Sequence, residues 1–189
     1  QQALHEKAKD SPSFRFYSLY DKIYREDMLL HAYRIQKRNG GVPGVDGETF
    51  DDIEKYGRKK WLGELAEELR NKTYEPEPVK REWIEKDSGG QRPLGIPTVR
   101  DRVAQTATLL VLEPIFEADL HPQQHGYRED HSAKQAVREV HRYVNRGYNE
   151  VVDADLSGYF DSIPHRELMK SISRRVSDGA MLALIEKWL

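Results

Sequence analysis

The stretch VVDADLSGYFDSIPH, residues 151–165, says more about the fold than any other part of the sequence. It begins with a hydrophobic run and continues with acidic side chains, which is typical of a β-strand over residues 150–156 that carries polar groups at its carboxyl end. Because side chains alternate along a strand, Asp153 and Asp155 would lie on one face. Pro164 would then open a helix that runs to about residue 174.

Two carboxylates on one face of a strand end could bind a hard divalent cation. Mg²⁺ prefers oxygen ligands and usually takes one or two carboxylates together with substrate phosphates. The same pattern also fits an ordinary strand end exposed to solvent. The two carboxylates alone therefore leave both interpretations open.

A β-hairpin is predicted upstream, from residues 79–86 and 91–96. The first segment contains aromatic and branched residues that suit a strand, and the string DSGG at 87–90 forms the turn. Lys86 and Arg92 would flank the tip. On the residues alone, cations that flank such a turn are those of an ordinary solvated hairpin.

The rest of the chain is predicted to be mostly helical. Thr98 would cap a helix to about residue 113, whose apolar second half indicates the central core helix. The glycine-rich string GGVPGVDG, residues 40–47, predicts a loop. Apolar residues at helical spacing predict the other helices: one over 17–38, or two with a break near Asp27; one from 49 or 51 to about 70; one over 132–146; and one from Asp178 and Gly179 to Leu189.

Composition bounds the class of protein. The 189 residues are 38 % hydrophobic and 10 % aromatic, enough to form a core, and the absence of cysteine excludes disulfides and thiolate zinc sites. Charged residues make up 33 % of the chain but nearly cancel to a formal net charge of −2, which excludes a uniformly basic nucleic-acid coat. No apolar run approaches the roughly 18 residues of a membrane span. We expect an intracellular protein without membrane contact.

The string DLSGYFD, residues 155–161, matches the Asp-aliphatic-x-x-aromatic-Phe-Asp pattern of the reverse-transcriptase palm. Three further blocks, at residues 39–47, 74–105 and 113–137, resemble earlier blocks of that family in the same order. Over roughly residues 39–165, the chain therefore resembles group II intron-encoded reverse transcriptase/maturases and their CRISPR-associated relatives.

The resemblance implies the fold class α+β, in which the fingers and the start of the palm of a right-hand polymerase are mostly helical, with a β-hairpin and short palm strands. It implies an N-terminal helical extension at residues 1–38, fingers at 39–148 and the truncated start of a palm at 149–189. The implied activity is that of an RNA-directed DNA polymerase, a nucleotidyl transferase that uses two metal ions.

The resemblance also implies roles at the reaction centre. Asp155 would be the catalytic carboxylate and metal ligand, with the backbone carbonyl of Leu156 beside it and Mg²⁺ as the cofactor. Phe160 corresponds to the bulky aromatic that excludes a ribose 2′-hydroxyl, and packing in a core would also explain it. The cations implied to bind the dNTP triphosphate are Lys80, Lys86 and Arg92.

Template and RNA contacts are implied for Arg100, Arg102, Tyr127 and Arg128. The string QHGYR at 124–128 departs mildly from the family pattern but keeps an aromatic residue and a cation, which suit stacking on and pairing with nucleotides. The implied partners are intron RNA, an RNA template with a DNA primer, and dNTP, in a bacterial cytoplasmic ribonucleoprotein.

The sequence lacks the Tyr-x-Asp-Asp string that completes the metal site of this family, so we expect the 189 residues alone to have no polymerase activity. Apolar residues of the last helix would lie bare and could support a homodimer. Two alternatives stay open. One is an RNA-binding maturase module that assists intron splicing without catalysis by this segment, and the other is an unrelated soluble interaction domain.

Overall fold

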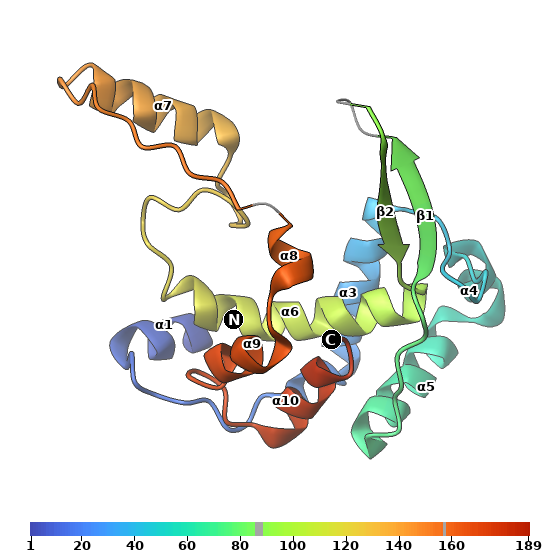
Figure 1. Ribbon diagram of the computed structural model, residues 1–189. Coiled ribbons are helices and arrows are strands. Elements are labelled where there is room, and N and C mark those ends of the chain that lie inside the picture. Colours follow the sequence, from blue (N-terminus) through green and yellow to red (C-terminus); the bar gives the residue numbers. More distant parts are fainter. Residues whose placement is uncertain (86–88, 157) are drawn as a thin grey trace.

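The structure is a computed structural model that describes residues 1–85, 89–156 and 158–189 (Figure 1). This part of the chain is mostly helical and contains an antiparallel β-hairpin, as predicted for the α+β class. No helix within these ranges has the length and apolar character that a membrane crossing requires. The strands are β1 (Lys80–Glu85) and β2 (Gln91–Ile96), and the helices are α1 (Gln2–Asp10), α2 (Tyr20–Ile23), α3 (Glu26–Asn39), α4 (Phe50–Tyr56), α5 (Arg58–Asn71), α6 (Val99–Glu117), α7 (Ala133–Val144), α8 (Tyr159–Ser162), α9 (His165–Ile172) and α10 (Gly179–Glu186).

Helix α6 crosses the middle of the molecule, and α1, α2 and α3 pack against it (Figure 1). Thr98 caps its first turn, because the Thr98 hydroxyl accepts a hydrogen bond of 3.1 Å from the backbone N–H of Asp101. Val103, Ala104 and Ala107 are fully buried. The prediction of a central core helix is confirmed.

Helix α6 continues past its predicted end because α1 compensates for Pro114. Proline has no N–H, so the carbonyl of Leu110, four residues earlier, loses its helical donor. The side-chain amide of Gln1 donates to this carbonyl at 3.0 Å, and Nδ1 of His5 lies 3.1 Å from the carbonyl of Pro114. These contacts seat α1 against the C-terminal half of α6.

The irregular segment between α1 and α2 is held by the buried side chain of Arg175, which follows α9. Its guanidinium donates to the backbone carbonyls of Ala8 at 2.8 Å and Ser11 at 3.2 Å, and also to that of Pro12. Its Nε lies 3.0 Å from a carboxylate oxygen of Asp119, just beyond α6. Such acceptors are what makes a buried guanidinium tolerable.

Asp178 joins α10 to α2. One of its carboxylate oxygens accepts from the backbone N–H groups of Ala180 and Met181, in the first turn of α10, at 3.1 and 3.2 Å. The other accepts from those of Leu19 and Tyr20, at the start of α2, at 2.7 and 2.8 Å. One side chain therefore caps two helices that are far apart in the sequence.

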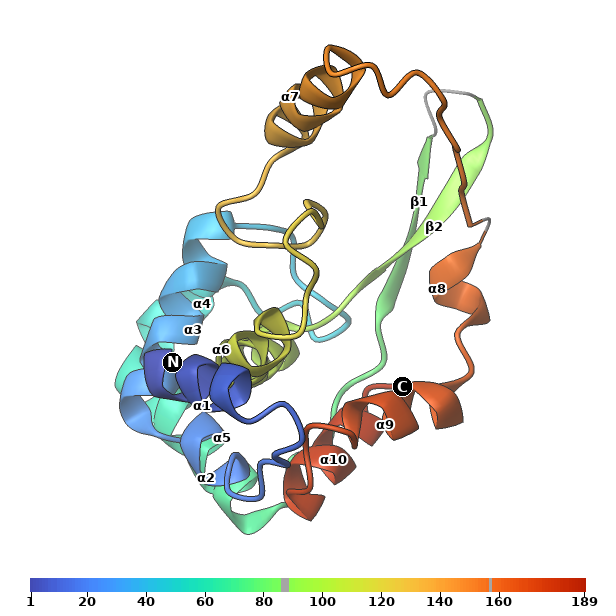
Figure 2. The ribbon, with the colours of Figure 1, turned by 90° about the vertical axis from the view of Figure 1, so that its left-hand side faces the viewer.

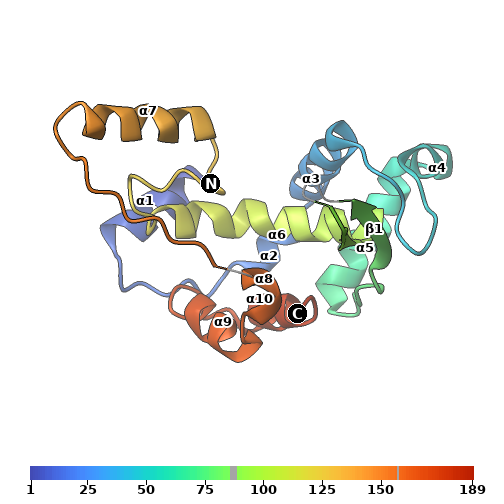
Figure 3. The same cartoon turned by 45° about the horizontal axis from the view of Figure 1, so that its top comes forward.

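Strands β1 and β2 form the predicted hairpin. The register pairs Ile84 with Arg92 and Trp83 with Pro93, and these neighbouring pairs face opposite sides of the hairpin. The hairpin and α7 stand near opposite ends of α6, as Figures 1 and 3 both show. Lys86, predicted at the tip, lies outside the described residues.

Two predicted helices are each divided. The region predicted as one helix over 17–38, or as two with a break near Asp27, forms two helices, α2 and α3. The alternative with the break is therefore the correct one. Helices α4 and α5 replace the one expected up to residue 70, because Gly57 takes a φ of 107° between them, an angle that a helix does not use. Helix α1 falls within residues 1–38, where a helical extension is expected, and its bounds were not predicted.

The strand predicted over residues 150–156, and with it the short palm strands, is wrong. Among the described residues, the only sheet consists of β1 and β2. Val151 is 76 % exposed and Val152 is 93 % exposed. Figure 2 shows this segment running from α7 to α8 at a distance from the helical body. A β-strand needs a partner for its backbone groups, and none pairs with this segment in the described chain.

The apolar surface expected to lie bare on the last helix is largely covered. Met181 and Leu184 are buried in the main core, and further apolar residues of α10 pack against it. The premise for a homodimer through this helix is therefore wrong. Exposed apolar side chains occur instead along α7, at Val137, Val140 and Val144.

Replacing Asp178 with Asn should destabilise the chain by about 1–2 kcal/mol, because the amide keeps one acceptor oxygen but places an NH2 group against the other pair of backbone N–H donors. Burial alone would raise the pKa of Asp178, but the four backbone N–H donors bring it below its ordinary value. Its stabilising effect is thus present above the unfolded pKa of about 3.9 and is lost as the pH falls through the lower folded value. Urea denaturation at about pH 7 and about pH 3 measures both effects.

Asp10→Asn is the matched control, because Asp10 is an exposed carboxylate at the end of α1. This variant should keep the stability of the wild type at both pH values. An Asp178→Asn variant as stable as the wild type at neutral pH would contradict the shared cap.

Candidate functional site

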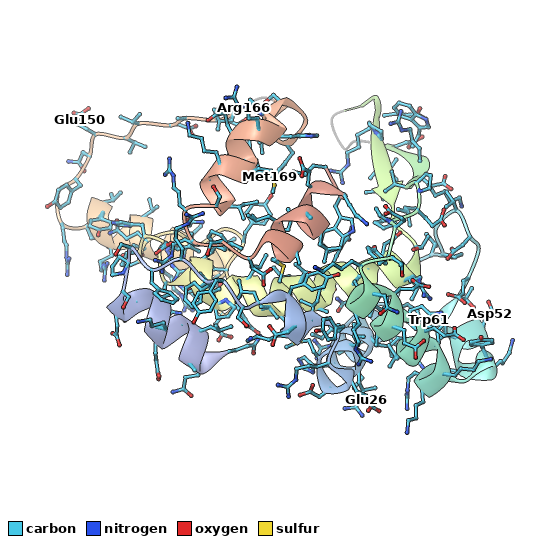
Figure 4. The ribbon with its side chains drawn as sticks, turned by 90° about the horizontal axis from the view of Figure 1, so that it is seen from below. Glu26, Asp52, Trp61, Glu150, Arg166 and Met169 are labelled. Carbon is cyan, nitrogen blue, oxygen red and sulfur yellow. The ribbon has the colours of Figure 1, made fainter. Side chains whose placement is uncertain are left out.

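The described site residues lie on the hairpin, at the start of α6, on the loop before α7, on the extended segment that leads to α8, and in α8 itself. Asp155 and Leu156 belong to the extended segment, and both are exposed. No ion pair of the described residues involves Asp155. Figure 4 shows Glu150, near the start of this segment, at one edge of the molecule, with Trp61 near the opposite edge.

The oxygen atoms at Asp155 have the right chemistry for a hard cation, but the set is incomplete. A carboxylate and a backbone carbonyl are ligands of the kind that Mg²⁺ accepts. In residues 1–85, 89–156 and 158–189, no group of three or more His, Cys, Asp or Glu side chains could hold a metal ion.

Two predicted site residues, Tyr127 and Phe160, are in contact. Phe160 lies in α8, after Gly158 in a left-handed conformation with a φ of 60°, and Tyr127 comes from the loop before α7. The two rings meet edge to face, with centroids 6.1 Å apart and planes at 82°. Tyr159 also contacts Phe160, with a centroid distance of 5.5 Å. No sequence pattern had linked Tyr127 to Phe160.

On the hairpin, Arg92 lies on the same face as Lys80. The ammonium of Lys80 is 2.9 Å from the carboxylate of Glu82 in an exposed pair. The opposite face carries Arg81 and Trp83, and the Trp83 side chain is 57 % exposed. Sequence reasoning gave these two residues no role, although an exposed aromatic beside a cation is a signal for nucleic-acid stacking.

Arg100 and Arg102, predicted to contact the template, are engaged inside the protein. Arg102 donates to the backbone carbonyls of Gly40 at 3.3 Å and Val42 at 3.1 Å, which holds the glycine-rich loop against α6. Burial lowers the pKa of Arg102. Arg100 pairs with Glu68 at 2.5 Å. Their template contacts stay predictions.

Arg128 also binds within the protein, and its side chain is only 10 % exposed. Its Nε lies 3.0 and 3.2 Å from the two carboxylate oxygens of Glu117, and its Nη1 donates to the carbonyls of His121 at 3.1 Å and Gln124 at 3.0 Å. The hydrogen bonds from Arg128 lower the pKa of Glu117. Arg128 therefore shapes the loop from α6 to α7.

An open groove of about 660 Å³ lies beside this loop, with walls from α3 and α6. Tyr127 and Arg128 line it from the loop, and Arg38 lines it from α3. Glu113 lines it from α6, and burial raises the pKa of this carboxyl group. Aromatic and cationic side chains in one groove suit a single-stranded nucleic acid.

Comparison with known proteins gives a family and several relatives. A family model described as "Reverse transcriptase (RNA-dependent DNA polymerase)" matches residues 84–189. Protein YkfC of Escherichia coli (strain K12) is 38 % identical over an alignment of 194 positions, which covers 99 % of this chain and 50 % of that protein. The group II intron-encoded protein LtrA of Lactococcus lactis subsp. cremoris is 34 % identical over 177 residues, 92 % of this chain and 29 % of that protein. The nuclear intron maturase 1, mitochondrial, of Arabidopsis thaliana is 31 % identical over 93 residues, 49 % of this chain and 13 % of that protein.

The chain spans half or less of the length of these relatives. The family match extends from within β1 through the segment with Asp155 and Phe160 to the last helix. The resemblance inferred from the sequence is confirmed. The chain belongs to the reverse transcriptase (RNA-dependent DNA polymerase) family, and its relatives include group II intron-encoded proteins and intron maturases.

Proposed function

We propose that the protein that contains this chain is an RNA-directed DNA polymerase of the group II intron type, which extends a DNA primer with dNTP on an RNA template. The family match over residues 84–189 carries the proposal, because it includes Arg92, Asp155 and Phe160 in one continuous stretch. The contact between Tyr127 and Phe160 supports it, since it joins residues expected at the template and at the nucleotide.

Asp155 is proposed to hold Mg²⁺ together with the backbone carbonyl of Leu156. Mg²⁺ usually keeps several waters and takes only one or two carboxylates plus substrate phosphates, so these two ligands would be part of its shell. When bound, the ion would stabilise the charge that develops on the transferred phosphoryl group. The exposure of Asp155 and its lack of a partner among the described ion pairs support this role.

The hairpin cations Arg92, Lys80 and Lys86 are proposed to bind the triphosphate of the incoming dNTP. A guanidinium can form two parallel hydrogen bonds with phosphate oxygens, whereas an ammonium acts as a point charge. The register supports joint action of Arg92 and Lys80, because both lie on one face. Phe160 is proposed to exclude a ribose 2′-hydroxyl by its bulk.

Template contact is proposed for the groove beside the loop before α7, whose Tyr127 ring is 91 % exposed. Arg100, Arg102 and Arg128 would act on the template indirectly. Their guanidinium groups hold the protein's own carbonyl and carboxylate groups, and so they keep the surfaces around the groove and the hairpin base in shape.

The 189 residues alone are proposed to be inactive as a polymerase. They supply Asp155 but contain no Tyr-x-Asp-Asp string, and the described residues hold no three-ligand metal cluster. A site of this kind needs further carboxylates to hold two ions.

A second candidate function is binding of intron RNA to assist splicing. Relatives that are named maturases favour it. The groove between α3, α6 and the loop could take part without any metal ion, because shape and phosphate contacts suffice to bind structured RNA.

Replacing Asp155 with Asn in the protein that contains this chain should lower kcat for primer extension by at least about 100-fold, because the amide removes the negative charge that holds the cation. Binding of template RNA, measured by filter retention, should stay within about twofold. Asp153→Asn is the matched control, since Asp153 is an exposed carboxylate in the same segment and is not proposed to bind metal.

Full primer extension by Asp155→Asn would overturn the assignment of this residue. Equal loss of synthesis in both variants would show that the segment needs its charges for folding or solubility, and not for metal binding at Asp155.

Replacing Arg92 with Ala should raise KM for dNTP by about tenfold or more, because a hydrogen-bonded charge pair with phosphate is lost. Arg81→Ala is the matched control, because it removes an arginine side chain from the other face of the hairpin. It should leave KM for dNTP within about twofold. Steady-state primer extension measures both. A similar KM increase for both variants would mean that net charge, and not the face of the hairpin, decides nucleotide binding.

A further inference from the structure

Phe160 needs support from outside its own helix if its ring is to exclude a 2′-hydroxyl. Steric exclusion works only when the blocking group keeps its place. Helix α8 is a single turn from Tyr159 to Ser162, and the Phe160 side chain is 68 % exposed. Neither the helix nor burial therefore fixes this ring.

Two other rings contact Phe160. Tyr159 lies 5.5 Å away, with its plane at 61°, and Tyr127 lies 6.1 Å away, with its plane at 82°. Aromatic pairs favour such edge-to-face arrangements. Because Tyr159 sits on the same short turn, Tyr127 is the ring that ties Phe160 to a separate part of the chain.

Tyr127 is itself held through its backbone. Its φ of 57° is a left-handed conformation, which a residue other than glycine keeps only when its surroundings impose it. The next residue, Arg128, anchors the loop at this point, because its guanidinium donates to Glu117 and to the carbonyls of His121 and Gln124. The root of the Tyr127 side chain is thus fixed although its ring is exposed.

We propose that Tyr127 is a positioning residue that determines sugar specificity, because its ring braces Phe160 beside the ribose of the incoming nucleotide. This proposal rests on the polymerase function proposed above and assigns it a further residue. It gives Tyr127 a role in rejecting rNTP that is separate from stacking on the template.

Primer extension by the protein that contains this chain tests the proposal, with kcat/KM compared for dNTP and the matching rNTP. Tyr127→Ala should lower the preference for dNTP by about three- to tenfold, mainly through faster use of rNTP, which is the effect of losing one aromatic contact. Tyr127→Phe keeps the ring and should preserve the preference within about twofold. Phe160→Ala gives the full size of the effect for comparison.

Affinity for the template separates the two roles of Tyr127. A Tyr127→Ala protein that binds template RNA less tightly but keeps the wild-type preference for dNTP would overturn the proposal. Wild-type protein that synthesises no DNA would instead overturn the polymerase function on which the proposal rests.

Fluorine NMR with para-fluorophenylalanine at position 160 tests the contact in the same protein without relying on activity. Tyr127→Ala should move the resonance of residue 160. Tyr148→Ala is the control, because Tyr148 is an exposed ring that pairs with Tyr143, and it should leave that resonance unchanged. An unmoved resonance in Tyr127→Ala would also contradict the proposal.

Discussion

The fold depends on one buried guanidinium that binds the backbone of an irregular segment. The chain between α1 and α2 contains no helix, and buried carbonyl groups without donors are costly. Arg175 supplies the donors, and Asp119 balances its charge. Since Arg175 follows α9 and Asp119 follows α6, the same contacts fix the position of α9 relative to the central helix. The side chain that donates hydrogen bonds to these carbonyl groups therefore also sets the arrangement of elements that are far apart in the sequence.

Support for the candidate site comes from two directions. On one side, Asp178 joins α10 to α2. Helix α8, which contains Phe160, directly precedes α9 and α10 in the chain. On the other side, Arg128 shapes the loop that presents Tyr127. The extended segment with Asp155 lies between these supports and has little packing of its own, since its valines are exposed. The aromatic part of the site is thus linked to a second element by the contact between Tyr127 and Phe160, although both rings are largely exposed.

Structural features that depend on residues close together in the sequence, such as helix caps and turns, could be predicted. Thr98 caps a helix as predicted, the helix expected from residue 132 begins with a cap from Ser132, and the turn string before residue 91 predicted the hairpin. The strand at 150–156 was wrong, because an apolar run becomes a strand only when another segment pairs with it. The partners of Arg102 and Arg128 could not be predicted, since the carbonyls that they bind come together only in the folded chain. Roles could therefore be assigned to residues by resemblance, and those roles stay predictions, whereas the contacts of these residues could not be predicted.

The two-sided hairpin also gives the molecule a natural optical reporter. The sequence has three tryptophans. Trp61 is buried and Trp188 packs against the core, whereas Trp83 is largely exposed on the hairpin face opposite Arg92. Any swing of the hairpin would change the surroundings of this indole far more than those of the other two. Quenching of intrinsic fluorescence by a small neutral solute can therefore follow the hairpin without a label and without altering the face that carries Arg92.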